Sequence, residues 1–379
     1  MRDSGLGTRD SGLGTRDQGF MKPKIAVLVC AAAAAGCAAP PSSRDRNLTL
    51  TAVDGLKVGH FTLAERPTGC TVVLATGGTI GAVDVRGAAP GTRETDVLNP
   101  LNNVRTVNAI LFSGGSAYGL DAASGVMKWL EEHHIGQPAG LAGVVPIVPS
   151  AVLIDLWFGG SPRVRPGPDC GYRAASVASG APVQEGNIGA GAGATVGKSL
   201  GYGSGKSGPM KAGIGSSAIA RPDGLIVAAM VAVNALGDII DPETGRVLAG
   251  ARDADGRLAD ARRLLRAGTT SAGRAGGNTT LGVVATNARL TNVQAQKVAQ
   301  MAHDGYARAI SPIHTLADGD TIFSLATGTW NGQASEGLVG ALAAEAIADA
   351  IVRAAVRATA SHGLPAARDL GTVPSRFKP

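Results

Sequence analysis

The stretch that most constrains this chain is residues 276–287, GGNTTLGVVATN, where a glycine-rich approach changes abruptly to an apolar, β-branched run. The run predicts a buried strand, and the glycines before it leave the backbone conformationally free. Asn278 and Thr279 lie at the junction. A threonine hydroxyl is a poor nucleophile unless a base lies beside it. If the Asn278–Thr279 bond were cut, the new α-amine of Thr279 would be that base. Taken alone, the same pattern also suits an ordinary loop leading into a core strand.

Composition limits the kind of core and the kind of partner. Of the 379 residues, 44% are hydrophobic but only 3% are aromatic, so the core must consist of Ala, Val, Leu and Ile. The length allows one large domain or two ordinary ones. The formal charge is +6, yet Lys and Arg are scattered and form no basic stripe interleaved with aromatic residues. Nucleic-acid binding is therefore not indicated.

The N-terminal region reads as a targeting segment. Residues 1–20 are a short polar repeat that we interpret as an upstream low-complexity extension. Residues 21–37 have a basic start and an apolar stretch too short for a permanent membrane span, and they end in a lipoprotein-type cleavage pattern at Cys37. Residues 38–47 read as a tether. We expect an exported, periplasmic protein that contacts the membrane only through lipid on Cys37, with simple secretion as the alternative.

Two cysteines, Cys70 and Cys170, remain in the part expected to fold. In an oxidising compartment they could pair, but a single spacing does not establish a disulfide. None of the histidines has zinc-ligand spacing to a second histidine on a helix, and we expect no metal site. We interpret His303 as a partly exposed helix residue.

Periodicity predicts the main secondary-structure elements. Buried strands are expected at 107–112, 225–233 and 321–326, and helices at 258–266, 291–309 and 335–358. Strands and helices do not alternate regularly, which favours a single α+β layered domain over residues 48–360. Residues 361–379 are expected to be a loosely held C-terminal tail.

One motif suggests chemistry that the context does not support. Residues 192–199, AGATVGKS, match the loose form of a phosphate-binding loop. That mechanism needs a helix after the loop, whereas a glycine-rich run follows Ser199. A turn-rich loop that lines a cavity is the better interpretation.

Several polar residues at strand ends are candidates for supporting a nucleophile. Asp318 and Asp320 precede a strand and form either a turn or a carboxylate pair that orients the nucleophile's amine. Asn234 ends an apolar strand and either closes a turn or donates its amide to an oxyanion. His314 could orient a nearby carboxylate or have a structural role.

Together these segments resemble one family of aminopeptidases. It includes the DmpA-type L-aminopeptidase/D-amidase-esterases, the β-peptidyl aminopeptidases and a pantetheine-amide hydrolase. The matching segments occur in the same order over residues 48–360. They are Gly91–Asp96, Gly114–Asp121, Val145–Pro149, Glu185–Gly189, Lys211–Gly215, Val233–Asn234, Asn278–Thr280 and Asp318–Asp320.

The resemblance implies an αββα four-layer sandwich that cuts itself, giving an α chain that ends at Asn278 and a β chain that begins at Thr279. It implies that Asn234 is the oxyanion-hole residue and that Asp318 and Asp320 form the acidic element. The Asn-Thr junction and Asp318 place the chain nearest the pantetheine-hydrolase-like branch. A tyrosine that lines the site in some members would fall near Ala151, where this chain has none.

The implied activity is hydrolysis of the N-terminal amide bond of short peptides or small amides through an acyl-enzyme. It needs no cofactor, and the processed units are expected to form a homo-oligomer. Two alternatives remain at this stage. One is an amidase for a non-peptide, pantetheine-like amide, and the other is a catalytically silent, lipid-anchored binding protein with the same fold.

Overall fold

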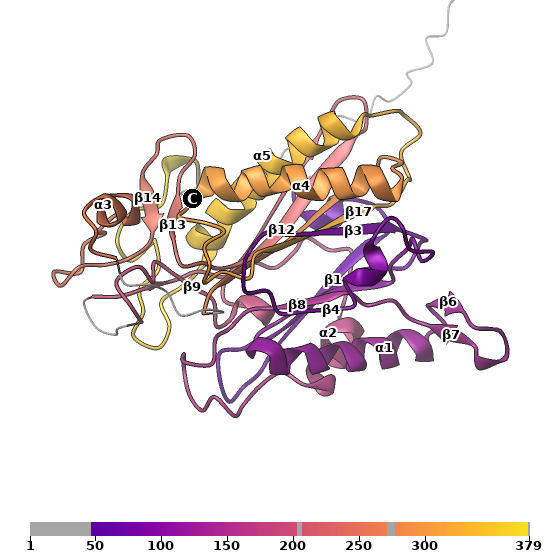
Figure 1. Ribbon diagram of the computed structural model, residues 1–379, viewed down its shortest axis with the longest axis horizontal. Coiled ribbons are helices and arrows are strands. Elements are labelled where there is room, and N and C mark those ends of the chain that lie inside the picture. The colour runs from indigo at the N-terminus through magenta and orange to yellow at the C-terminus, as the bar shows by residue number, and fades with distance from the viewer. Residues whose placement is uncertain (1–46, 203–206, 271–276, 378–379) are drawn as a thin grey trace, which may run out of the picture. The chain divides into compact units, whose positions relative to one another are not determined.

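Two five-stranded sheets form the centre of the protein (Figure 1). The computed structural model describes residues 47–202, 207–270 and 277–377. The first sheet has the strand order β1 (Leu56–Thr62), β2 (Gly69–Ala75), β5 (Ala109–Ser113), β8 (Ser150–Val152), β4 (Thr92–Arg93). The second has the order β11 (Ile214–Ala220), β12 (Ile226–Asn234), β15 (Thr279–Thr286), β17 (Thr321–Ala326), β3 (Ile80–Val85).

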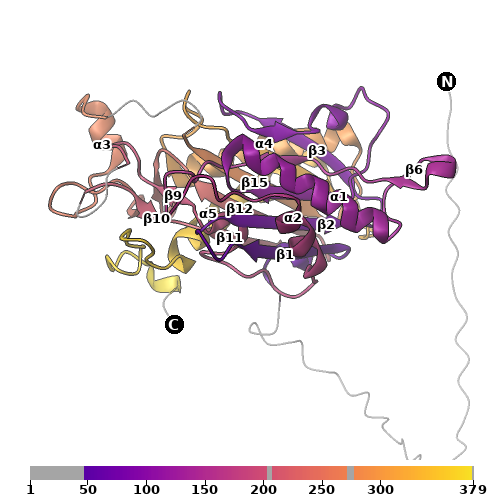
Figure 2. The ribbon, with the colours of Figure 1, turned by 90° about the horizontal axis from the view of Figure 1, so that it is seen from below.

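Helices cover the outer face of each sheet. The long helices α4 (Asn292–Ala309) and α5 (Glu336–Arg357) pack on the second sheet, and α1 (Ala122–Glu132) and α2 (Pro168–Ser176) pack on the first. Figure 2 shows α1 and α2 over the first sheet from below. The fold is therefore the expected αββα four-layer sandwich.

Shorter elements connect these layers. The short strands are β6 (Gln137–Pro138), β7 (Val144–Val145), β9 (Thr195–Val196), β10 (Met210–Lys211), β13 (Asp238–Ile240), β14 (Val247–Ala249) and β16 (Ile310–Ser311), and the short helix is α3 (Ala261–Arg266). Single 3-10 turns are η1 (Leu50–Ala52), η2 (Asp96–Leu98), η3 (Ser116–Asp121), η4 (Gly140–Ala142), η5 (Gly189–Gly191) and η6 (Ser375–Phe377).

Apolar side chains fill three spaces between the layers. The space between the sheets holds aliphatic residues together with Phe112 and Phe323, whose ring centroids are 6.3 Å apart. The space under α4 and α5 is rich in Ala, Val and Ile. Small side chains let the α5 backbone approach β11 closely, which explains how so few aromatic residues suffice for the core.

Strand β15 places the candidate cleavage junction at one end of the second sheet. It pairs antiparallel with β12, where Thr279 lies opposite Asn234, and parallel with β17, where Leu281 lies opposite Thr321. The end of β12, the start of β15 and the segment before β17 therefore meet. This pairing brings together candidate residues that lie far apart in the sequence.

Cys70 of β2 and Cys170 of α2 form a disulfide, with their Cα atoms 5.9 Å apart. The bond links the first sheet to α2, one of its two covering helices. It spans 100 residues of sequence, and chain-entropy arguments give a loop of that length a stabilisation of about 4.7 kcal/mol.

Some sequence expectations need correction. His303 is not partly exposed, because α4 turns it inward, where Nε2 contacts the backbone oxygen of Asp84 in β3 at 3.1 Å. The helix expected at 258–266 begins only at Ala261, after Asp260 accepts a capping hydrogen bond from the Arg262 N–H. The first part of the tail is anchored, since Leu364 and Ala366 are buried. The proposed signal peptide and Cys37 lie outside the described residues, so export stays a prediction.

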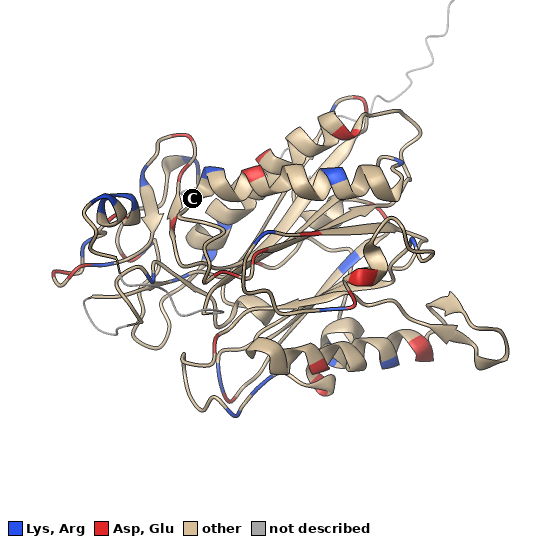
Figure 3. Cartoon of the chain, viewed as in Figure 1, with Lys and Arg blue, Asp and Glu red and all other residues tan. Residues whose placement is uncertain are grey.

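Charged residues are distributed over both helical layers and the loops (Figure 3). No single-sign face is visible in that view. Within the ranges described, none of the helices combines the length and apolarity needed to cross a bilayer.

Candidate active site

The hydroxyl of Thr279 lies against the carbonyl of the residue before it. Its Oγ1 donates to the Asn278 oxygen at 2.5 Å, and the Gly319 N–H donates to the same oxygen at 3.0 Å. Both Asn278 and Thr279 are buried. The carbonyl that Thr279 would attack is thus already polarised by a fixed backbone donor, as an oxyanion hole requires.

Asp320 and Asp318 lie beside this junction, as predicted, and have different partners. Asp320 Oδ1 accepts a hydrogen bond from the Thr280 N–H at 2.7 Å. This bond fixes the backbone at the start of β15. Asp318 accepts from the Thr315 N–H at 3.0 Å and the Leu236 N–H at 3.4 Å. Burial, and next the charge of Asp320, raise the pKa of Asp318.

Asn234 lies opposite Thr279, but its side chain is engaged elsewhere in the uncut chain. Its Nδ2 donates to the Ile154 oxygen at 3.0 Å, and its Oδ1 accepts from the Thr195 N–H at 3.1 Å. An amide nitrogen carries two hydrogens, so one remains for a second acceptor. These bonds therefore fix the orientation of the Asn234 side chain at the junction, and that side chain makes no direct hydrogen bond to Thr279.

Lys198 is a buried member of the cluster that the sequence did not identify. Its Nζ donates to the Asn234 backbone oxygen at 2.8 Å and to Asn234 Oδ1 at 2.9 Å. Burial lowers its pKa to about 7, against the opposing attraction of Asp318. The expected cavity-lining loop at 192–199 is the source of this residue. A single lysine in a run of small residues was the available signal.

His314 meets Asp320, which agrees with the orienting role considered for it. Its Nδ1 lies 2.9 Å from Asp320 Oδ2. On the other side of the junction, the Tyr202 hydroxyl donates to the Gly277 oxygen at 3.4 Å. The Trp157 ring packs edge-on against Tyr202 with centroids 5.0 Å apart. Aromatic side chains thus flank the residues that precede the candidate cut.

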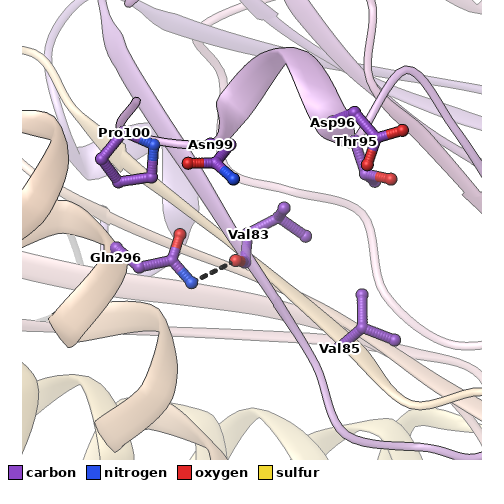
Figure 4. A pocket seen from close by; sticks show the side chains of 7 residues that line it. All are labelled: Val83, Val85, Thr95, Asp96, Asn99, Pro100 and Gln296. Carbon is purple, nitrogen blue, oxygen red and sulfur yellow. Dashed lines mark hydrogen bonds between the residues drawn. The ribbon is translucent and has the colours of Figure 1, made fainter. Parts of the chain in front are cut away.

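A surface depression of about 410 Å³ lies beyond the cluster, between β3, η2 and α4 (Figure 4). Gln296 of α4 reaches across it and donates to the Val83 oxygen at 2.6 Å, which covers part of the outer edge of β3. The lining contains neither Thr279 nor the two aspartates. Thr279, the candidate nucleophile, therefore does not open into this depression in the uncut chain.

Metal ligation has no support among the described residues, where no group of three or more His, Cys, Asp or Glu side chains is placed to hold an ion. The chemistry available to the described site is that of a hydroxyl, two carboxylates, an amide, a lysine and backbone N–H groups.

The layered fold is that of the Ntn-hydrolase aminopeptidases of the DmpA type. A solved L-aminopeptidase D-Ala-esterase/amidase from Ochrobactrum anthropi superposes with a TM-score of 0.64 at 17% identity, covering 89% of this chain and 99% of that chain. That enzyme has a variant of the Ntn hydrolase fold.

The chain belongs to peptidase family S58, whose family model matches residues 49–368. An uncharacterized aminopeptidase of Mycobacterium tuberculosis is 40% identical over 351 residues, covering 85% of this chain and 97% of that protein. A 6-aminohexanoate-oligomer endohydrolase of Paenarthrobacter ureafaciens is 30% identical over 332 residues, covering 83% of this chain and 88% of that protein. The protein is thus a hydrolase of peptidase family S58.

Proposed function

We propose that this protein cuts its own chain between Asn278 and Thr279 and then hydrolyses the N-terminal amide bond of short peptides or small amides. The contact of Thr279 Oγ1 with the Asn278 carbonyl carries the proposal, because it places the hydroxyl at the bond that must break. The Gly319 N–H supports it by supplying a donor for the oxyanion.

In the first step, Thr279 Oγ1 attacks the Asn278 carbonyl carbon. The carbon–nitrogen bond breaks, the hydroxyl proton passes to the Thr279 nitrogen, and Asn278 becomes an ester on Oγ1. Water opens the ester and leaves a carboxylate on Asn278 and a free amine and hydroxyl on Thr279. Both residues are buried, so substrate reaches Thr279 only after the end of the α chain leaves its position.

In each later turnover the Thr279 amine takes the proton from Oγ1 as the oxygen attacks the substrate carbonyl. The Gly319 N–H and the free hydrogen of Asn234 Nδ2 stabilise the oxyanion, and each such donor is worth roughly 2.7–4 kcal/mol in comparable sites. Asp320 holds β15 through the Thr280 N–H. Water then hydrolyses the acyl-enzyme and regenerates Thr279.

A non-peptide amide is the second candidate substrate. The family relative named for 6-aminohexanoate oligomers acts, by its name, on amides of an ω-amino acid rather than an α-amino acid. The missing tyrosine at Ala151 also separates this site from that of some family members. The intact junction speaks against a silent binding protein.

Two neighbouring threonines allow a matched test of the nucleophile. Thr279 and Thr280 are both buried, and replacement by valine removes only the hydroxyl while keeping the shape. Denaturing mass spectrometry should find wild type split after Asn278, Thr280→Val also split, and Thr279→Val intact. Processed wild type and Thr280→Val should hydrolyse a panel of aminoacyl-p-nitroanilides and small amides. Splitting of Thr279→Val at the same bond would exclude Thr279 as the nucleophile.

A further inference from the structure

Both oxygens of the Asp320 carboxylate are engaged, and each by a different part of the chain. Oδ1 accepts the Thr280 N–H at 2.7 Å, next to the nucleophile. Oδ2 faces His314, from which it accepts the backbone N–H at 3.1 Å and contacts Nδ1 at 2.9 Å. His314 therefore touches the carboxylate on the side away from Thr280.

The hydrogen-bond pattern assigns the tautomer of His314. An ionised carboxylate only accepts hydrogen bonds, so Nδ1 must carry the hydrogen. The other ring nitrogen, Nε2, is buried and has no partner among the described residues. A single hydrogen on Nδ1 satisfies the contact with Asp320 and leaves no buried donor unpaired on Nε2.

Helix α4 holds the ring in this orientation. The His303 ring lies 4.8 Å from the His314 ring and the Tyr306 ring lies 5.9 Å away, centroid to centroid. Tyr306 is anchored by its own hydroxyl, which donates to the Thr280 oxygen at 3.2 Å. Burial lowers the pKa of His303 to about 4, so that this neighbour is uncharged at neutral pH.

The backbone of His314 is itself constrained. Its φ of 56° lies in the left-handed region, which non-glycine residues adopt rarely. Such a conformation persists only where the surroundings hold it. The backbone N–H bond to Asp320 Oδ2 is one of these restraints.

We propose that His314 is a positioning residue for the reaction at Thr279, acting by donating its Nδ1–H to Asp320 Oδ2 and fixing the ionised carboxylate that holds the start of β15. This inference rests on the function proposed above. A purely structural role, in which His314 only fills space under α4, is the competing explanation.

A test of this proposal must leave the charged and titratable groups around His314 and Asp320 unchanged. Asp318 lies two residues before Asp320. Burial lowers the pKa of Lys198, and the charges of both carboxylates oppose this shift. From α4, the uncharged His303 and the buried Tyr306 face His314. Behind His303 lie Asp84 of β3 and Arg86. A variant at His314 alone leaves all of these groups in place.

Three variants separate the two explanations. His314→Asn retains an N–H donor near the position of Nδ1, and asparagine tolerates φ above zero. His314→Gly also tolerates this backbone but removes the donor. His134→Gly is the matched control, because His134 is exposed and has a similar φ of 57°. For each variant we would measure thermal unfolding, the rate of splitting after Asn278, and the pH dependence of splitting and of kcat/KM.

We expect His314→Gly to split and turn over about 10- to 100-fold more slowly, because losing one hydrogen bond to a charged group costs about that factor. Its acidic limb should move up by about 1–2 pH units, since a donor to a charged group has been lost. His314→Asn should keep the wild-type limb, and His134→Gly should match wild type throughout.

Two results would overturn the inference. One is a His314→Gly protein with the wild-type acidic limb that differs only in melting temperature. The other is a folded His314→Asn protein as impaired as His314→Gly. Failure of the proposed function would look different, since wild type itself would remain unsplit and behave like Thr279→Val.

Discussion

At the scale of single residues, the site combines a nucleophile with buried charges that water would otherwise screen. Lys198 and Asp318 are both fully buried and do not form an ion pair with each other. Each is satisfied by amide and hydroxyl groups. Burial disfavours the charged form of each group, which lowers the pKa of the lysine and raises that of the aspartate. The charge of Lys198 therefore changes near neutral pH.

Lys198 should make stability depend on pH above neutrality. Its pKa falls from 10.5 in the unfolded chain to about 7 in the folded protein. Between these values the unfolded chain binds more protons, so the free energy of unfolding rises with pH, by up to about 1.4 kcal/mol per pH unit. Urea unfolding of the Thr279→Val protein from pH 7 to 10 should show this rise, and adding Lys198→Met should reduce the slope.

The exposed Lys57 provides the control for this experiment. Its side chain stays in water in both states, so Lys57→Met should leave the slope unchanged. Equal slopes with and without Lys198 would show that this lysine does not lose its proton on folding.

At the scale of elements, the second sheet and its covering helix come closest where β11 contacts α5. A Cβ on Gly215 of β11 would lie 2.0 Å from the Ala350 oxygen and 2.4 Å from the Ala354 nitrogen, both in the α5 backbone. Backbone atoms cannot move aside as a flexible side chain does. The absence of a side chain at this position sets the separation between the second sheet and its helix.

Gly215→Ala should therefore push α5 away from the sheet and lower the free energy of unfolding by about 1–3 kcal/mol, as overpacking does. Gly180→Ala is the matched control, since no heavy atom lies within 4 Å of a Cβ built there. Thermal unfolding of the two variants in the Thr279→Val background checks the prediction. Equal melting temperatures would mean that α5 can shift without cost.

At the scale of the whole molecule, the proposed cut divides the sandwich without dividing its core. Strands β15 and β17 would belong to the β chain, yet they lie between β12 and β3 of the α chain. Helices α4 and α5 would also belong to the β chain and cover the same sheet. All four cysteines precede Asn278. The two chains would therefore be held by packing and strand pairing alone.

Processed protein should accordingly elute as a single species from native size-exclusion chromatography and give two bands on denaturing gels without reductant. Thr279→Val should give one band under the same conditions. Fragments that stay joined until reductant is added, or that separate under native conditions, would contradict this arrangement.

Much of the fold was predictable because burial leaves a periodic trace in the sequence. The strand expected at 321–326 is β17, and the helices expected at 291–309 and 335–358 are α4 and α5 with their capping residues. The junction at Thr279 was visible because a loose glycine approach meets a buried strand. His303 was misjudged because one residue in an amphipathic helix does not reveal which face its neighbours cover.

The sequence by itself determined the elements, the candidate nucleophile and, through the family resemblance, the layered fold, because these depend on local patterns of burial and backbone freedom. Only the tertiary structure decided that Lys198 reaches Asn234, that His314 reaches Asp320, and that Cys70 pairs with Cys170. It also decided that the Gly319 N–H faces the Asn278 carbonyl. Such contacts depend on which strands pair and in what register. Every residue type except proline has a backbone N–H, so a sequence pattern cannot show which N–H faces the site.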